Sequence, residues 1–186
     1  KALTVCLLSY NQMKTLPEEI GNCVELTQLD LQHNELEKLP DSVGKLTNLV
    51  RFGIRYNKLR ELPKSLENLD KLEELIVENN HLKALPDGML NSLPKVKTVN
   101  LSRNDLTAFP AGGPQQFAAA VSINLEHNAI SKVPIGIFSR ATGLTKLNLK
   151  ENELSQLPLD MGTWTSITEL NLSTNQLKVL PDDIEK

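Results

Sequence analysis

The stretch LTQLDLQHNELEKLPDSVGKLTN, residues 26–48, carries the pattern on which the whole chain is built. Its fixed polar residue is Asn34, and a proline, Pro40, follows six residues later. Leu29 and Leu31 stand two residues apart, as they would on a strand that buries one of its faces. The apolar positions of the stretch share one spacing and are Leu26, Leu29, Leu31, Leu36, Leu39, Val43 and Leu46.

Each part of this stretch has a physical role in a chain that turns back on itself. Asn34 follows the predicted strand, where its side chain can satisfy backbone groups of a turn. Pro40 prevents a helix from starting early and removes one hydrogen-bond donor. Val43 and Leu46 then return the chain over the same core. A single unit of this size cannot bury its own apolar face, so it must stack on copies of itself.

Such copies run through the entire sequence, and each has its asparagine and its proline. An L-x-x-L-x-L-x-x-N-x-L spacing at a period of about 20–29 residues is the signature of a leucine-rich repeat. The sequence therefore predicts an α/β leucine-rich-repeat solenoid that forms a right-handed arc. We expect a curved parallel sheet, with one strand per repeat, on its concave face, and 3-10, irregular or short helical segments on its convex face. The predicted repeats form one array and span residues 3–25, 26–48, 49–71, 72–95, 96–119, 120–143, 144–166 and 167–186, the last being cut short.

Composition limits the functions and the cellular compartments that can be expected for this chain. The chain has 186 residues and a net charge of −3, which gives no reason to expect nucleic acid or an anionic membrane as a partner. No apolar run is long enough to span a bilayer. Cys6 and Cys23 replace leucines of the pattern, so we expect both thiols in the core. The sequence shows neither disulfide-rich nor polar end caps, which predicts an internal piece of a longer array in the cytoplasm or possibly the nucleus.

Repeat five departs most from the pattern. Gly112-Gly113-Pro114 cannot hold a helical turn, so we expect an irregular convex loop pinned by Phe109 and Phe117. A tolerated loop variant and a bulge that contacts a partner both explain this segment. In repeat seven, Trp164 replaces a core leucine, and we expect it to be buried.

The sequence carries no recognisable catalytic or metal-binding pattern. It has no phosphate-binding glycine loop, no nucleophile elbow and no Cys/His cluster with metal-ligand spacing. His33 and His127 share one repeat position but lie four strands apart, roughly 19 Å at ~4.8 Å per strand. We therefore expect no enzyme activity, no metal and no cofactor.

Function is then expected on the exposed concave face of the sheet. Arg51, Arg55 and Tyr56 surround Gly53 there, and arginine and tyrosine are enriched at interface hot spots. Two plainer interpretations remain: the charges form weak cross-strand pairs, and Gly53 is merely tolerated in a strand. The candidate partner-binding residues are Tyr10, His33, Arg51, Gly53, Arg55, Tyr56, Glu74, Glu78, Asn79, Arg103, Glu126, His127 and Lys150.

Several segments resemble one family of repeat proteins in detail. They are LDLQHNEL (29–36), IRYNKL (54–59), GGPQQF (112–117), GIFSRA (136–141), PLDMGTWTS (158–166) and ELNLSTNQL (169–177). The pieces GGPQQF and GIFSRA are the most specific, because the repeat pattern does not require them. Together these segments resemble the Shoc/Sur-type leucine-rich-repeat scaffolds of the Ras–MAP kinase pathway.

The resemblance implies a non-catalytic scaffold with two protein partners. That family joins a GTP-loaded Ras-type GTPase, typically M-Ras, to the catalytic subunit of type-1 protein phosphatase. The complex removes an inhibitory phosphate from Raf kinases, so Raf is an indirect partner. Arg51, Arg55 and Tyr56 match the family's R-x-x-x-R-Y motif. The alternatives are a generic intracellular recognition module, or the repeat region of a ligase or kinase.

Overall fold

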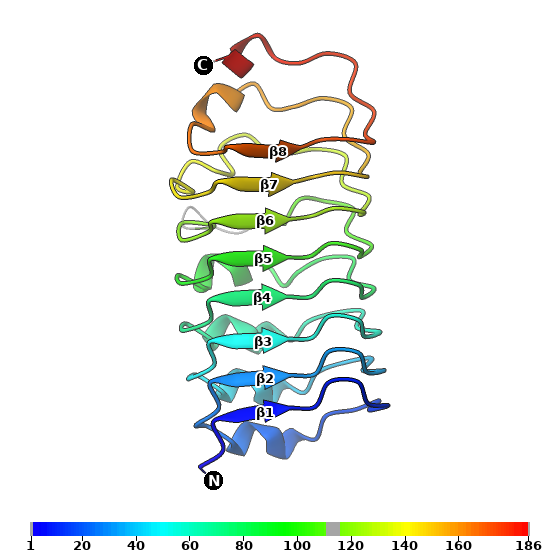
Figure 1. The fold of residues 1–186 in the computed structure, drawn as a ribbon, viewed down its shortest axis with the longest axis vertical. Helices are drawn as coiled ribbons and strands as arrows, with labels where there is room; N and C mark the ends of the chain where they lie inside the picture. The colour runs from blue at the N-terminus through cyan, green and yellow to red at the C-terminus, as the bar shows by residue number, and fades with distance from the viewer. Residues whose placement is uncertain (1, 111–115, 186) are drawn as a thin grey trace.

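The chain folds into eight stacked coils, each of which contributes one short strand to a single parallel sheet (Figure 1). The computed structural model describes residues 2–110 and 116–185. Strand order follows the sequence from one end to the other, as predicted from the repeat. The strands are β1 (Val5–Leu7), β2 (Gln28–Asp30), β3 (Arg51–Gly53), β4 (Glu74–Ile76), β5 (Thr98–Asn100), β6 (Ser122–Asn124), β7 (Lys146–Asn148) and β8 (Glu169–Asn171).

Strand pairing aligns equivalent repeat positions across the sheet. Leu29 pairs with Phe52, and the central residue of each strand from β2 to β7 is buried in the core. The residues on either side of it form two outward columns of side chains. We call this outward side the sheet face. Its two columns are Val5, Gln28, Arg51, Glu74, Thr98, Ser122, Lys146 and Glu169, and Leu7, Asp30, Gly53, Ile76, Asn100, Asn124, Asn148 and Asn171.

Short 3-10 segments return the chain behind the sheet, and no described segment exceeds five residues, as the repeat length predicts. Pro17, Pro40 and Pro63 each precede such a segment in extended conformation, since proline cannot continue a strand ladder. The segments are η1 (Glu18–Asn22), η2 (Asp41–Lys45), η3 (Lys64–Asn68), η4 (Met89–Ser92), η5 (Met161–Thr163) and η6 (Asp182–Glu185).

The coils rise as an uncurled stack in Figure 1, so the arc that the sequence predicts is not seen in this view. The 3-10 helix is narrower than the α-helix, which lets the back of the array stack nearly as closely as its strands. Glycines bring two of these segments closer still. A Cβ atom added to Gly44 would lie 2.5 Å from both the Cβ and the carbonyl oxygen of Ser65 in the next coil.

A ladder of asparagine side chains ties each coil to the one before it. The Asn80 amide group donates to the carbonyl oxygens of Ile54 (3.0 Å) and Val77 (3.1 Å). Its side-chain oxygen accepts the backbone N–H of Leu59 at 3.0 Å. The same bonds recur at Asn57, and both side chains are buried. Because buried backbone groups need partners, each asparagine supplies what the turn itself leaves unpaired.

Aromatic side chains fill the core where repeat five breaks the pattern. Phe109 and Phe117 are buried in edge-to-face contact, with ring centroids 6.2 Å apart. Phe138 contacts both of them and also Trp164, at 5.1 Å. Trp164 is buried, as predicted. The expected irregular loop at Gly112–Pro114 lies outside the described residues.

The prediction that the Cys6 and Cys23 thiols lie in the core holds only in part. Both thiols are free and only half-buried, although they pack against the core. The reason is their place in the first coil, which has a neighbouring coil on one side only. Partial burial still raises the pKa of the Cys6 thiol, and the nearby Cys23 thiol raises it by a smaller amount.

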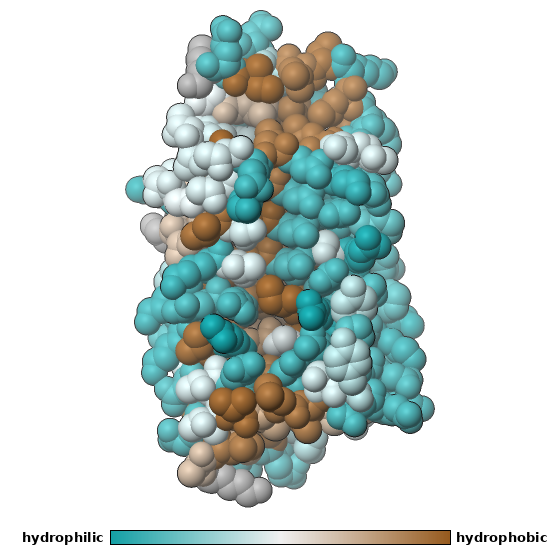
Figure 2. Space-filling view, in the orientation of Figure 1, coloured by the Kyte–Doolittle hydropathy of each residue, from teal (hydrophilic) through white to brown (hydrophobic). Residues whose placement is uncertain are grey.

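The exposed apolar surface of the two end coils leads us to expect self-association of the chain. Figure 2 shows apolar surface gathered at both ends of the stack, with mostly hydrophilic residues between them. Leu7 is 61% exposed at β1, Val179 is 72% exposed beyond β8, and both strands have an unpaired edge. Open edges beside apolar surface invite pairing with another chain. We expect the mean mass in light scattering to rise with concentration, and a constant monomer mass at high concentration would contradict this.

Candidate functional site

A tight turn ends every strand of the sheet and sets the direction of one outward side chain. The residue just before each ladder asparagine has a positive φ, between 52° and 57°, although none of these residues is a glycine. Non-glycine residues rarely adopt this left-handed conformation, so its repetition reflects the geometry of the coil. These residues form a third column: Tyr10, His33, Tyr56, Asn79, Arg103, His127, Glu151 and Thr174.

The first three members of this third column stack on one another. The His33 ring lies between Tyr10 and Tyr56, with centroid distances of 4.2 and 4.3 Å and interplanar angles of 10° and 9°. The Tyr56 hydroxyl donates to Glu78 at 3.5 Å. Tyr10, at the end of the stack, is 72% exposed. The turns thus build a flat aromatic wall along one edge of the sheet face.

A hollow of about 290 Å³ lies on the sheet face, and Gly53 is part of its lining. Arg51 and Arg55 line it together with Asp30 and Glu74. A Cβ atom at Gly53 would lie 3.2 Å from the Asp30 carboxylate, a tight contact. The glycine therefore keeps the hollow open and also leaves the Asp30 side chain in place.

The plainer interpretation, in which the charges form cross-strand pairs, does not hold for Arg55, which does not pair with Glu78. Arg55 instead donates through Nε to the side-chain oxygen of Gln32, on the opposite neighbouring strand. Gln32 is itself held by Asp30, which accepts its backbone N–H at 3.0 Å and its side-chain amide at 2.9 Å. Arg55 forms no ion pair with any residue in the described parts of the chain. The guanidinium group is therefore positioned but not neutralised.

Arg51 and Glu74 do form the cross-strand pair that the sequence predicts, at 3.7 Å. Both side chains are well exposed, and such pairs contribute little to stability. This pair therefore fixes the rim of the hollow, while the positive charge of Arg55 remains available to a partner.

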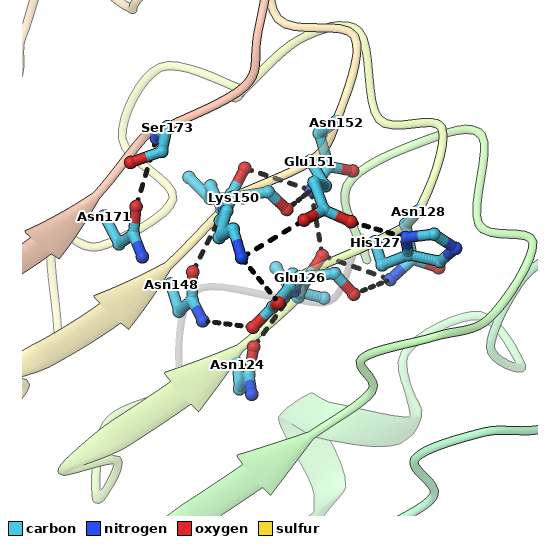
Figure 3. A network of polar contacts seen from close by, with 12 residues as sticks. Asn124, Glu126, His127, Asn128, Asn148, Lys150, Glu151, Asn152, Asn171 and Ser173 are labelled. Carbon is cyan, nitrogen blue, oxygen red and sulfur yellow. Dashed lines mark hydrogen bonds and ion pairs between the residues drawn. The ribbon is translucent and has the colours of Figure 1, made fainter.

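A second polar group lies higher on the sheet face, across β6 and β7 (Figure 3). Lys150 contacts Glu126 at 3.5 Å, as predicted, and also Glu151 at 3.1 Å. His127 Nδ1 lies 2.7 Å from the other Glu151 oxygen. Asn148 donates to Glu126 at 2.9 Å, so one network joins these five side chains.

Each titratable group of this network has a polar partner within it. Two hydrogen bonds lower the pKa of Glu151. The bond from His127 has the larger effect, and the bond from Lys150 the smaller one. The bond to Glu151 likewise raises the pKa of Lys150. Lys150 and Glu151 thus hold each other in their charged forms, whereas Arg55 has no ion-pair partner in the described parts of the chain.

The structure places the predicted site residues in two groups. The first group has two parts: Arg51, Gly53, Arg55 and Glu74 line the lower hollow, and Tyr10, His33 and Tyr56 form the aromatic wall, whose Tyr56 hydroxyl bonds to Glu78. The second group, Glu126, His127 and Lys150, belongs to the upper network. Asn79 and Arg103 lie between the two groups, and both are exposed. Gln32, Asp30, Asn148 and Glu151 were missed. The repeat spacing could have identified these four residues. It places each of them in the same column as a predicted site residue, or in a neighbouring column, one coil away.

Two kinds of site are not seen in the described parts of the chain. No group of three or more His, Cys, Asp or Glu residues there is arranged to hold a metal ion. Within residues 2–110 and 116–185, none of the helices has the length and apolar character needed to cross a bilayer.

This fold and face define a class of repeat protein that binds other proteins along an extended surface. Residues 5–102 match the family described as leucine-rich repeat region, and residues 118–177 match the family described as leucine rich repeat. The chain belongs to the leucine-rich-repeat family. Arrays of this kind are typically non-catalytic binding modules. No curated protein matches the chain significantly.

Solved structures carry the same architecture. A leucine-rich-repeat protein of Leptospira interrogans is 30% identical, with a TM-score of 0.90 over 98% of this chain and 46% of its own. A TDR receptor is 30% identical, with a TM-score of 0.76 over 87% of this chain and 28% of its own. The chain thus spans less than half the length of these proteins.

A third similar structure contains a bound partner. It is the leucine-rich-repeat ectodomain of the plant membrane receptor kinase GASSHO1/SCHENGEN3 from Arabidopsis thaliana, in complex with CASPARIAN STRIP INTEGRITY FACTOR 2. Identity is 26% and the TM-score is 0.67, over 98% of this chain and 25% of that one.

Proposed function

We propose that this chain is a protein-binding scaffold of the Shoc/Sur type, and that the lower hollow of the sheet face is its principal contact. One observation carries the proposal: Arg55 is held in place by Gln32, beside an aromatic wall and an open hollow, without a carboxylate partner of its own in the described chain. Arginine and tyrosine beside a preformed hollow are typical of interface anchors.

The proposed partners follow from the family resemblance and from this chemistry. They are a GTP-loaded Ras-type GTPase, typified by M-Ras, and the catalytic subunit of type-1 protein phosphatase, with Raf as the indirect target. Arg55 would pair with an acidic side chain of a partner, and Tyr56 would pack against its apolar surface. The proposed setting is the cytoplasm or the nucleus, where a reducing environment keeps Cys6 and Cys23 as thiols.

Reversing the charge at Arg55 is expected to weaken partner capture by about thirtyfold or more, the equivalent of losing an interface anchor worth ~2 kcal/mol. Binding of immobilised chain to GTP-loaded M-Ras, to the phosphatase subunit and to both together measures the effect. Arg60→Glu is the matched control: it makes the same charge change in the same repeat, outside the sheet face. Equal binding by Arg55→Glu and Arg60→Glu would remove the hollow from the interface.

Tyr56 needs a different substitution, because its positive φ and its contact with His33 make alanine a poor probe. Asparagine tolerates this backbone conformation, so Tyr56→Asn removes the ring at lower backbone strain. We expect it to weaken capture as well, and its thermal midpoint separates lost binding from lost stacking. Failure of the unsubstituted chain to bind either protein would reject the Shoc/Sur assignment and leave a recognition module with another partner.

A further inference from the structure

Two aliphatic side chains stand exposed on the back of the array, at a position where other repeats carry charge. Ile135 is 67% exposed and Leu159 is 80% exposed, although neither lies in an end coil of the stack. Each directly follows the proline of its repeat. In five other repeats this position holds a charged residue: Glu18, Asp41, Lys64, Asp87 and Asp182. The coil therefore does not need an apolar side chain here.

The two residues lie next to each other on successive coils. The Gly136 backbone N–H donates to the Asp160 carboxylate at 2.7 Å, which joins the chain just after Ile135 to the chain just after Leu159. Neighbouring coils in such a sheet rise by about 4.8 Å. Isolated apolar residues are common on protein surfaces, but an adjacent pair of this kind needs an explanation.

A hollow of about 410 Å³ opens beside Ile135. Pro134 and Phe109 supply apolar walls, and Thr107, Ala108, Ser131 and Lys132 complete the lining. It differs from the lower hollow of the sheet face, which is lined by charged side chains. Its size and lining suit one large apolar anchor from another molecule.

Charge around this position is mainly positive. Residues 129–146 contain Lys132, Arg140 and Lys146 and no acidic residue. Lys146 pairs with Glu169 on the sheet face, whereas Lys132 and Arg140 are exposed and form no ion pair within the described parts of the chain. The nearby Asp160 uses one oxygen for Gly136, and its other oxygen is buried.

We propose that Ile135, Leu159 and the hollow beside them form a second docking site, for an acidic amphipathic helix of another protein. Side chains at positions i and i+4 of a helix have Cβ atoms about 5–6 Å apart, which matches the step between successive coils. Two such anchors would cover Ile135 and Leu159 and enter the hollow, and acidic residues beside them would meet Lys132 and Arg140. A hollow that takes one anchor, beside two apolar side chains one coil apart, fits a helical protein segment better than a flat lipid surface.

The test uses a fluorescein-labelled acidic helical peptide with leucines at i and i+4, titrated with the whole chain and followed by anisotropy. A peptide with every glutamate changed to lysine and one with the leucines redistributed are the comparison probes. We expect the acidic amphipathic peptide to bind and both others to bind about tenfold more weakly. Equal binding of the acidic and lysine peptides, or no binding of the acidic one, would overturn the proposal.

Variants then locate the binding. Ile135→Asp and Leu159→Asp introduce a residue that other repeats carry at this position, so folding should persist, and each should weaken binding about tenfold. Lys132→Glu should weaken it as well. Lys64→Asp, at the same position of repeat three, and Arg55→Glu, on the sheet face, should leave the affinity unchanged. Full affinity in Ile135→Asp and Leu159→Asp, at unchanged thermal midpoints, would refute the site.

Two further measurements distinguish a protein helix at this docking site from binding elsewhere on the chain and from a membrane contact. Amide chemical shifts on peptide addition should change near residues 107–108, 131–136 and 159–160, and changes confined to the sheet face would contradict the assignment. Co-sedimentation with phosphatidylserine vesicles should be absent. Vesicle binding that Ile135→Asp abolishes would overturn the proposal in favour of a membrane contact.

Discussion

Replacing Asn80 with alanine is expected to lower the free energy of unfolding by about 3 kcal/mol. The substitution removes the acceptor of the Leu59 N–H and the donor to the Ile54 carbonyl, and both groups belong to the preceding coil. These backbone groups are buried, and water cannot replace the lost side chain without opening the stack. Urea-induced unfolding, followed by circular dichroism, measures the change.

The neighbouring Asn79 provides the comparison. It is exposed and its φ is 55°, a conformation in which asparagine is favoured over alanine. Asn79→Ala should therefore cost about 1 kcal/mol through backbone strain alone. Asn79→Gly should cost almost nothing, because glycine adopts this conformation freely. A larger loss for Asn79→Ala than for Asn80→Ala would mean that Asn80 is not the structural member of the pair.

Gly44→Ala is expected to destabilise the array by about 2 kcal/mol, through overpacking rather than through a lost interaction. The new methyl group would lie 2.5 Å from the Ser65 carbonyl oxygen, which is backbone and cannot rotate away. Relief requires η2 and η3 to separate, and that would disturb the burial of Val43 and Leu66. Thermal unfolding should show a lower midpoint.

A second glycine serves as the control for this effect. A Cβ atom at Gly143 would meet only the Ala120 carbonyl oxygen, at 3.7 Å, which is an ordinary contact. Gly143→Ala should leave the midpoint unchanged or raise it slightly by restricting the unfolded chain. If both alanine variants melted at the temperature of the unsubstituted chain, close packing behind the sheet would not limit stability.

The repeated spacing was sufficient to predict the sheet. Leu29, Leu31 and Asn34 define a buried strand and its turn, and a register shift of one residue would turn Leu29 to solvent. Equivalent positions must then align, so the columns follow directly. Trp164 and Phe117 could be assigned to the core for the same reason, since each replaces or flanks a leucine of the pattern.

Side-chain pairing on the sheet face could not be predicted from the spacing. A residue in a column has a neighbour on each side, and the sequence does not show that Arg55 chooses Gln32 over Glu78. The stacking of His33 between two tyrosines was missed because it depends on the positive φ that the turn imposes. Cys6 is half-buried because it lies in an end coil. The repeat spacing assigns it to a core position but does not show how many coils cover that position.

The asparagine ladder gives the array a direction. From Asn34 onward, each ladder asparagine hydrogen-bonds backward to the preceding coil, as Asn57 does to the N–H of Leu36 and the carbonyl of Leu31. The turn of each coil is thus held by the asparagine of the coil that follows it. Tension applied at the carboxyl end would therefore detach whole coils one after another. The same arrangement restricts how such a gene can change in length. Gain or loss of a complete repeat preserves every fastening, whereas a shift of a few residues inside a coil leaves two buried backbone groups unpaired.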